Sequence, residues 1–256
     1  MVYDVHVHLP TMGADYAENK RILQKCHEEL EIDKFFVSGF YAIPNGNPAM
    51  TEELNAQVAR LHRELPQIVE GYLYVNPRHE DCVERLRRAV EDDGFAGVKL
   101  WMATTCDDER VFPVAEAAIR YNIPILIHCF HKAVDQIYNE TLGPHVANLA
   151  RRYPEAKLIM AHLGGNPYHS IPAIRDCPNV WVDNSHSIFR ADELRYTYER
   201  LGAGRILFGT DIPGNTWVKY GEVLELPVSE EERKDIFFRN AQRIFDRNYY
   251  VSGGKL

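Results

Sequence analysis

The chain has 256 residues, of which 45% are hydrophobic and 26% are charged, a composition typical of a folded protein with a large apolar core. Its net charge of −8 and isoelectric point near 5.8 argue against a general nucleic-acid-binding protein. The sequence has no apolar run of about 18 residues, so we expect neither a membrane-spanning helix nor a membrane partner.

The cysteines are odd in number, widely spaced and without a C-x-x-C pair. Such cysteines are typical of reduced thiols, and the chain enters a predicted strand directly, without a signal-peptide pattern. We therefore expect a cytoplasmic protein. The five cysteines are Cys26, Cys82, Cys106, Cys129 and Cys177.

Eight short apolar runs with the composition of buried strands recur along the chain, about 30 residues apart, which is the size of a βα unit. They cover residues 3–9, 34–41, 70–76, 95–101, 123–129, 157–163, 180–186 and 205–211. Amphipathic helical stretches lie between them. Residues 51–65 form one such stretch with Thr51 as its expected N-cap, and residues 229–245 form another, opened by Ser229 and Glu232 at capping-box spacing.

Strands that alternate with helices in this way predict a parallel sheet, and eight repeats predict a closed (β/α)8 TIM barrel, an α/β fold, as a single domain over residues 1–256. The main alternative is an open doubly wound sheet. That fold usually carries G-x-G-x-x-G after its first strand, and "HLPTMGADY" has no such motif.

The first predicted strand carries two histidines, His6 and His8, in an alternating pattern that puts them on one face and Val5 and Val7 on the other. Two adjacent imidazoles pack poorly in a core, because their ring nitrogens need polar partners. They are good ligands for a divalent metal ion. The pair alone is weak evidence for a metal site.

Further polar groups lie at the ends of later predicted strands, where barrels place their catalytic residues. Taken singly, each has an ordinary explanation: a hydrogen-bonded core histidine, a strand cap, a turn aspartate or a lysine in an ion pair. A single cation would satisfy all of them together, so the set predicts a metal site at the carboxyl ends of the strands. The residues are Lys99, His128, His162 and Asp211.

The ordered motifs resemble the amidohydrolase superfamily, in particular its branch of amidohydrolase-related barrels, which includes metal-dependent hydrolases, lactonases and non-oxidative decarboxylases. The resemblance covers essentially the whole chain. The matching motifs are D-x-H-x-H at Asp4, His6 and His8, "GVKLW" around Lys99, "PILIH" ending at His128, "AHLGG" at His162 and "FGTD" ending at Asp211.

The resemblance implies that His6, His8, His128 and Asp211 bind a divalent ion, with zinc expected and manganese as the alternative. Asp211 would then orient a metal-activated water and act as general base, and His162 would polarise the substrate carbonyl. If Lys99 is carboxylated and bridges two ions, His128 and His162 bind the second one. We expect one ion, in which case Lys99 pairs with an anionic group of the substrate.

The loops at the strand ends supply the predicted substrate contacts. Several are basic and suited to a carboxylate, which favours a small acidic or cyclic substrate; each of them could also be an ordinary exposed loop residue. Those contacts are Lys99, Trp101, His131 and His186, with Tyr41, Asn45, Lys132 and Arg190 nearby.

Three functions fit these motifs. The leading one is metal-dependent hydrolysis of an amide, lactone or related carbonyl bond in a small molecule. The second is non-oxidative decarboxylation of a small carboxylic acid on the same scaffold. The third is a barrel that binds a metal or ligand without turnover, against which the open coordination position argues. A homodimer is left open as the oligomeric state.

Overall fold

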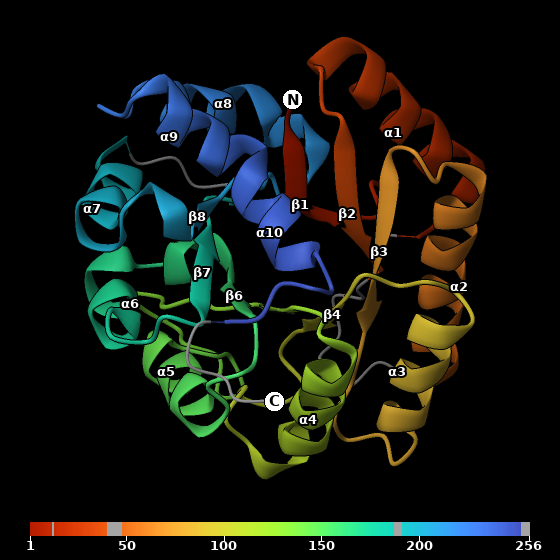
Figure 1. Cartoon of the computed structure of the whole chain (residues 1–256). Coiled ribbons are helices and arrows are strands. Elements are labelled where there is room, and N and C mark those ends of the chain that lie inside the picture. Colours follow the sequence, from red (N-terminus) through yellow and green to blue (C-terminus); the bar gives the residue numbers. More distant parts are fainter. Residues whose placement is uncertain (12, 40–47, 187–190, 252–256) are drawn as a thin grey trace.

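The computed structural model describes residues 1–11, 13–39, 48–186 and 191–251. Eight parallel strands follow one another around a single sheet in chain order, β1 to β8, with the helices outside them (Figure 1). The two edges meet because Val7 and Asp211 form a parallel bridge and the Val5 amide donates to the Phe208 carbonyl at 3.0 Å. The predicted (β/α)8 barrel is confirmed.

The strands are short and parallel, so their carboxyl ends all lie at one end of the barrel. They are β1 (Tyr3–His8), β2 (Lys34–Ser38), β3 (Val69–Tyr74), β4 (Gly97–Leu100), β5 (Ile125–Ile127), β6 (Leu158–Met160), β7 (Val180–Asp183) and β8 (Ile206–Leu207). The helices are α1 (Tyr16–Leu30), α2 (Pro48–Glu64), α3 (Cys82–Glu91), α4 (Phe112–Tyr121), α5 (Gly143–Arg152), α6 (Pro167–Ile174), α7 (Ala191–Leu201), α8 (Thr216–Leu224), α9 (Glu230–Lys234) and α10 (Asn240–Phe245).

Two boundaries differ from prediction. Helix α2 begins at Pro48, so Thr51 lies within it and is not its N-cap. Strands β5, β6 and β8 end before their predicted polar residues, which sit in the turns that follow. The predicted capping box is confirmed, because the Ser229 hydroxyl accepts from the Glu232 amide and the Glu232 carboxylate accepts from the Ser229 amide at the start of α9.

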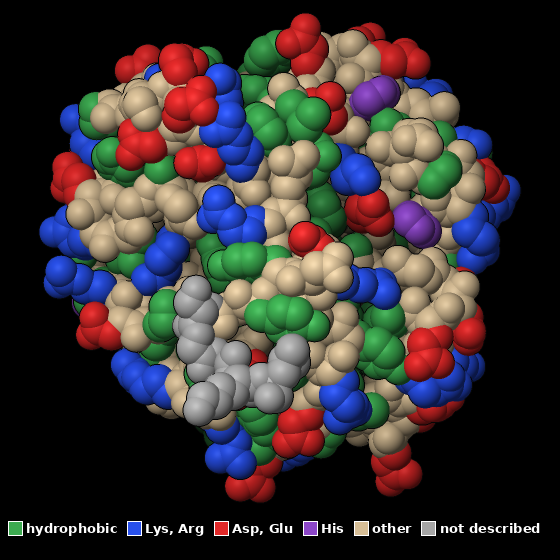
Figure 2. Space-filling model, in the orientation of Figure 1, with side chains coloured by type: hydrophobic (Ala, Val, Ile, Leu, Met, Phe, Trp, Pro, Cys, Tyr) green, Lys and Arg blue, Asp and Glu red, His purple; other side chains and the backbone are tan. Residues whose placement is uncertain are grey.

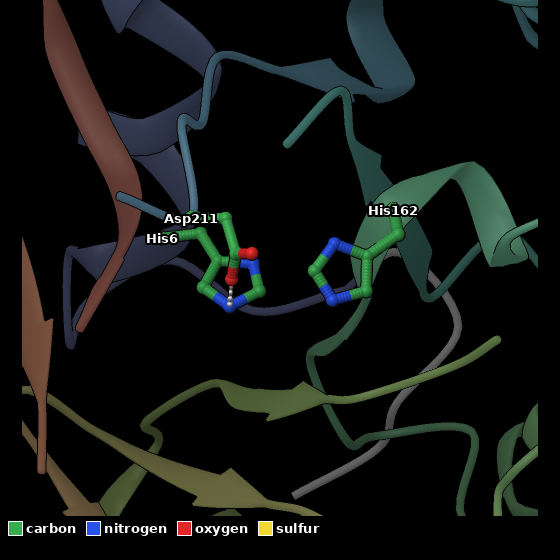
Figure 3. Close-up of side chains that lie close together, drawn as sticks. All are labelled: His6, His162 and Asp211. Atoms are coloured by element: carbon green, nitrogen blue, oxygen red, sulfur yellow. Dashed lines mark ion pairs between the residues drawn. The ribbon is translucent and has the colours of Figure 1, made fainter. Parts of the chain in front are cut away.

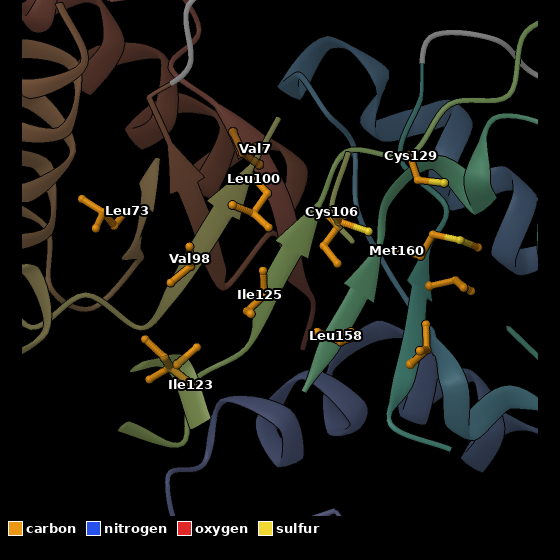
Figure 4. Packing of buried hydrophobic residues seen from close by; sticks show 14 of the residues in the cluster. Val7, Leu73, Val98, Leu100, Cys106, Ile123, Ile125, Cys129, Leu158 and Met160 are labelled. Carbon is orange, nitrogen blue, oxygen red and sulfur yellow. The ribbon is translucent and has the colours of Figure 1, made fainter. Parts of the chain in front are cut away.

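Outward-facing strand residues pack against the helices and form the larger part of the core. Figure 4 shows Val98, Ile125 and Leu158 in this layer, on three neighbouring strands. All three are fully buried. Because side chains alternate along a strand, the strand residues next to these three point into the barrel.

The inward-facing residues form a second apolar cluster, which we call the interior ring: Val5, Phe36, Tyr72, Leu126, Ile159, Trp181 and Leu207. Strand β4 contributes Gly97 at this level, because a Cβ there would lie 2.7 Å from the Tyr72 ring. Helix α10 crosses the middle of the barrel in Figure 1 and packs Ala241 and Ile244 against the ring. The amino-terminal end of the barrel is therefore filled with apolar side chains.

Strand β1 departs from regular alternation. Val5 belongs to the interior ring, whereas Val7 packs in the outer core, so the prediction that these two valines share a face is wrong. The reason is an irregularity in the pairing of β1 with β2 between Asp4 and Val7. It leaves both His6 and His8 directed toward the carboxyl end of the barrel interior.

Acidic and basic side chains are interspersed over the face shown in Figure 2. Among the described residues, the structure contains no helix that is both long and apolar enough to cross a bilayer. The predicted rim residues Tyr41, Asn45 and Arg190 lie outside the part of the chain that the structure describes.

Candidate metal centre

A polar layer lies directly beyond the interior ring. It arises because residues two positions further along a strand face the same side. Ser38 follows Phe36 in this way, and Asp183 follows Trp181. Lys99 occupies the equivalent place on β4, two residues after Gly97, and His128 stands two residues after Leu126.

The two histidines of β1 and Asp211 converge in this layer. Nε2 of His6 lies 3.2 Å from Nε2 of His8, and Oδ1 of Asp211 lies 3.6 Å and 3.3 Å from these two nitrogens. Lys99 is fully buried, and its Nζ donates to Nε2 of His6 at 2.9 Å. Four predicted site residues therefore meet at one point.

The backbone of Asp211 is held in a left-handed conformation, with φ of 71°. Its amide donates to the His6 carbonyl at 2.7 Å, and its carbonyl accepts from the His8 amide at 3.1 Å. Aspartate tolerates this conformation better than most residues. The turn after β8 is thus tied to both ends of the His6–His8 segment, which places the carboxylate beside the two rings.

His162 reaches the centre from a left-handed turn after β6. Both His162 and Leu163 have positive φ, at 61° and 50°, and Gly164 and Gly165 continue the turn at 78° and 73°. A Cβ on Gly165 would lie 2.6 Å from the backbone nitrogen of His131, so this close approach requires glycine. The His162 amide donates to Oδ1 of Asp183 at 3.0 Å, which anchors the turn.

These turns bring together side chains that are far apart in the sequence. One ligand atom each from His6, His162 and Asp211 lie within 4.8 Å of one another (Figure 3). His128 joins them through Nδ1, which lies 3.2 Å from Nε2 of His162. The structure thus brings all five predicted metal ligands together at the carboxyl end of the barrel.

The outer nitrogens of two of these histidines face groups that accept hydrogen bonds. Nδ1 of His6 donates to Oδ2 of Asp183 at 3.0 Å, and Nδ1 of His162 donates to the Ser185 carbonyl at 3.1 Å. A carboxylate and a carbonyl cannot donate, so these nitrogens carry the ring protons. Nε2 of each ring is left with a lone pair directed at the centre, which is the arrangement that metal-bound histidines show.

Burial sets the protonation of the centre. It lowers the pKa of His8 to about 3 and the pKa of His128 and His162 below the usual value, so these three imidazoles are neutral. Burial opposes ionisation of Asp211, but its hydrogen bond with His8 and the other histidines hold its pKa well below the usual range. The donor set of neutral imidazoles and a carboxylate fits Zn²⁺ or Mn²⁺.

A family model for amidohydrolases matches residues 3–247. The chain belongs to the amidohydrolase family. The resemblance inferred from the motifs is therefore confirmed, and with it the prediction of an enzyme of this type. No curated protein matches the chain.

Solved structures share the fold of this amidohydrolase at low sequence identity. A 2,6-dihydroxybenzoate decarboxylase from Rhizobium superposes with a TM-score of 0.73 at 18% identity, covering 95% of this chain and 97% of its own. A dihydroxybenzoic acid decarboxylase from Polaromonas sp. JS666, with bound manganese and 2-nitroresorcinol, gives 0.72 at 19%, covering 95% and 96%. A 4-oxalomesaconate hydratase from Rhodopseudomonas palustris gives 0.70 at 18%, covering 96% of each chain.

The predicted substrate residues of the amidohydrolase lie in three places. His131 and His186 line a cavity of about 340 Å³ that opens beside His162. The Trp101 ring lies 6.4 Å from the His128 ring. Lys99 lies deeper, against His6, and burial lowers its pKa to about 8; its pairing with an anionic group of the substrate stays a prediction.

Sequence reasoning missed the residues that hold the ligands. Asp183 and Ser185 contact His6 and His162, Ser38 contacts Nδ1 of His8 at 2.8 Å, and Glu140 contacts Nε2 of His128 at 2.9 Å. Asp183 could have been found, because it stands two residues after an apolar strand residue, as Lys99 does. Glu140 lies in a loop and carries no comparable signal.

Proposed function

We propose that this amidohydrolase is a metal-dependent, non-oxidative decarboxylase of a small carboxylic acid. The observation that carries the proposal is the convergence of His6, His162 and Asp211, in which the lone pairs on Nε2 of both histidines are directed at the centre. The named activities of the similar structures, two decarboxylases and a hydratase, favour decarboxylation over hydrolysis, which was the leading prediction from the sequence.

The proposed ligands of one divalent ion come from His6, His8, His128, His162 and Asp211. We favour manganese over zinc as the ion, because the similar decarboxylase from Polaromonas sp. JS666 holds manganese. When bound, the ion supplies a Lewis acid that attracts a substrate oxygen and draws electrons from the bond to be broken. We favour one ion, as expected from the sequence, with Lys99 beside Nε2 of His6.

The substrate would occupy the cavity beside His162. Its wall includes Phe130, whose ring stacks on His186 with centroids 4.6 Å apart, together with Leu163 and Leu194. A cavity of about 340 Å³ suits a molecule the size of a single-ring acid. Lys132 also lines the cavity, where its Nζ is paired with Glu140.

Decarboxylation breaks the bond between the carboxyl carbon and its neighbour, leaves the electron pair on that neighbour and releases carbon dioxide. The neighbouring carbon then takes a proton. Asp211 is the group proposed to hold that proton, because its carboxylate lies beside His6 and His8 and its side chain is 25% exposed, whereas Asp4 and Asp183 are fully buried. It would take the proton from a substrate hydroxyl or from water and return it to carbon. His162 would orient the substrate oxygen.

The test is a panel of hydroxybenzoates, carboxyvanillate and simple lactones, offered to protein loaded with Mn²⁺ or Zn²⁺. Release of carbon dioxide in D₂O, with one deuterium at the vacated carbon of the product, supports decarboxylation. Turnover that inserts ¹⁸O from labelled water without carbon dioxide supports hydrolysis and overturns the proposal. Tight metal binding with no turnover on the whole panel would support the non-catalytic barrel.

A further inference from the structure

We propose that Glu140 is a positioning residue that sets the tautomer of His128 and so directs Nδ1 of His128 into the metal centre. The inference deepens the proposed function, since it rests on His128 being a ligand. Glu140 lies in the loop between β5 and α5, outside every motif of the sequence, and touches neither the cavity nor the reacting position.

The contact between the two residues is direct and buried. Oε1 of Glu140 lies 2.9 Å from Nε2 of His128, and Glu140 is 3% exposed. An ionised carboxylate only accepts hydrogen bonds, so Nε2 of His128 must donate. A neutral imidazole carries one proton, and Nδ1 is therefore left with its lone pair.

The charge of Glu140 is balanced on its other side. Oε2 accepts from Nζ of Lys132 at 2.6 Å and from Nε2 of Gln136 at 2.9 Å. A buried carboxylate with a cation and an amide on one oxygen and an imidazole N–H on the other is fully partnered, so it can stay ionised at this depth. The loop thus supplies its own counter-ion for the group that holds His128.

The consequence appears where His128 meets His162. Nδ1 of His128 and Nε2 of His162 lie 3.2 Å apart, and the proton of His162 is held on its far side by the Ser185 carbonyl. Two lone pairs aimed at one point repel each other, and a cation between them removes the repulsion. Without Glu140, His128 can carry its proton on Nδ1 and donate a hydrogen bond to Nε2 of His162. That hydrogen bond would occupy the position of the metal ion.

Two readouts test this role without using activity. The first is ¹⁵N NMR of histidine-labelled, metal-free protein, with the His128 signals assigned by their loss in His128→Asn. We expect the proton on Nε2 in the wild type and a shift of population to Nδ1 in Glu140→Leu. The second is affinity for Mn²⁺ by chelator competition, for which we expect Glu140→Leu to bind about 10- to 100-fold more weakly.

Two further variants separate positioning from loop folding. Glu140→Gln has one oxygen, which can accept either from Nε2 of His128 or from Nζ of Lys132, so we expect a mixture of the two tautomers and a smaller loss of affinity than in Glu140→Leu. Gln136→Ala removes the neighbouring contacts of the same loop, including its bond to the Phe130 carbonyl, but leaves Glu140 paired with His128 and Lys132, and we expect a much smaller change in Mn²⁺ affinity than in Glu140→Leu.

The inference is overturned if His128 carries its proton on Nδ1 in the wild type, if Glu140→Leu binds Mn²⁺ as tightly as the wild type, or if Gln136→Ala weakens binding as much as Glu140→Leu. Failure of the proposed function looks different: the wild type itself would take up no divalent ion. The NMR measurement uses metal-free protein and decides the role of Glu140 toward His128 in that case as well.

Discussion

Nδ1 of His6 lies 3.0 Å from Oδ2 of Asp183, and both side chains are fully buried. The other oxygen of Asp183 accepts from the backbone amides of His162 and Ser185, at 3.0 Å each. One carboxylate therefore orients two predicted metal ligands that lie more than 150 residues apart in the sequence.

Asp183→Asn should weaken divalent-metal binding about 10- to 100-fold. The amide can place its N–H against Nδ1 of His6, and the ring then carries its proton on Nε2 and its lone pair on Nδ1, away from the metal centre. Chelator competition with Mn²⁺ measures the change. Asp192→Asn, an exposed position on α7, is the matched control and should bind as the wild type does. Equal affinity in Asp183→Asn would remove the orienting role of Asp183.

Asp211→Asn should keep the fold and lose turnover, because the amide cannot hold and return a proton. The measurement is product formation with whichever acid the wild type consumes, beside the far-UV circular dichroism spectrum. His6→Ala should instead lose metal, as elemental analysis would show. Full activity in Asp211→Asn would exclude Asp211 as the proton-transfer group.

Lys157→Met should lower the free energy of unfolding by about 2–4 kcal/mol, since it leaves buried carbonyls without a donor. Nζ of Lys157 donates to the carbonyls of Asn122, Ile244 and Asp246, at 2.9 to 3.1 Å, where α10 closes the amino-terminal end of the barrel. Urea unfolding measures the loss. Metal affinity should not change, and a matching loss of affinity would show that the two ends of the barrel are coupled.

Asp4 gives a prediction about pH. Burial raises its pKa from 3.8 to about 8, although Thr210 and the His6 amide donate to it. The folded state therefore binds a proton at Asp4 that the unfolded state has released over this range, so the contribution of Asp4 to stability falls as pH rises from about 4 to about 8. Unfolding of metal-free wild type and Asp4→Asn at several pH values isolates it. Parallel curves would contradict the raised pKa.

Gly165→Ala should reduce turnover, because the new Cβ meets the backbone nitrogen of His131 at 2.6 Å and its immediate neighbour Phe130 in a left-handed turn. The turn can relieve the clash only by moving, and His162 moves with it. Activity and thermal unfolding are measured together. A variant with wild-type activity would show that the position of His162 does not depend on this turn.

Much of the fold and the ligand set could be predicted from the sequence, because both depend on short-range patterns. Strand periodicity gives the barrel, and strand-end positions give His128, His162 and Asp211. The left-handed turns that carry His162 and Asp211 beyond their strands could not be predicted, because they depend on bonds to Asp183 and to β1.

The same limit applies to the supporting residues. Glu140 contacts His128 from a loop, and the conformation of a loop cannot be predicted from a periodic sequence pattern. Strict alternation also failed in β1, where Val5 and Val7 separate because of the pairing irregularity. The contact of Lys99 with His6 was not predicted either, because it depends on how β1 and β4 face each other inside the barrel.

The interior ring and the polar layer stand two residues apart on the same strands, for example Phe36 and Ser38 or Trp181 and Asp183. Two residues of strand span about 6.6 Å. Insertion or deletion of one residue between them would turn one member of each pair outward. The length of these strands is thus constrained twice, once by folding and once by chemistry, and we expect inserted or deleted residues to be tolerated only in the loops.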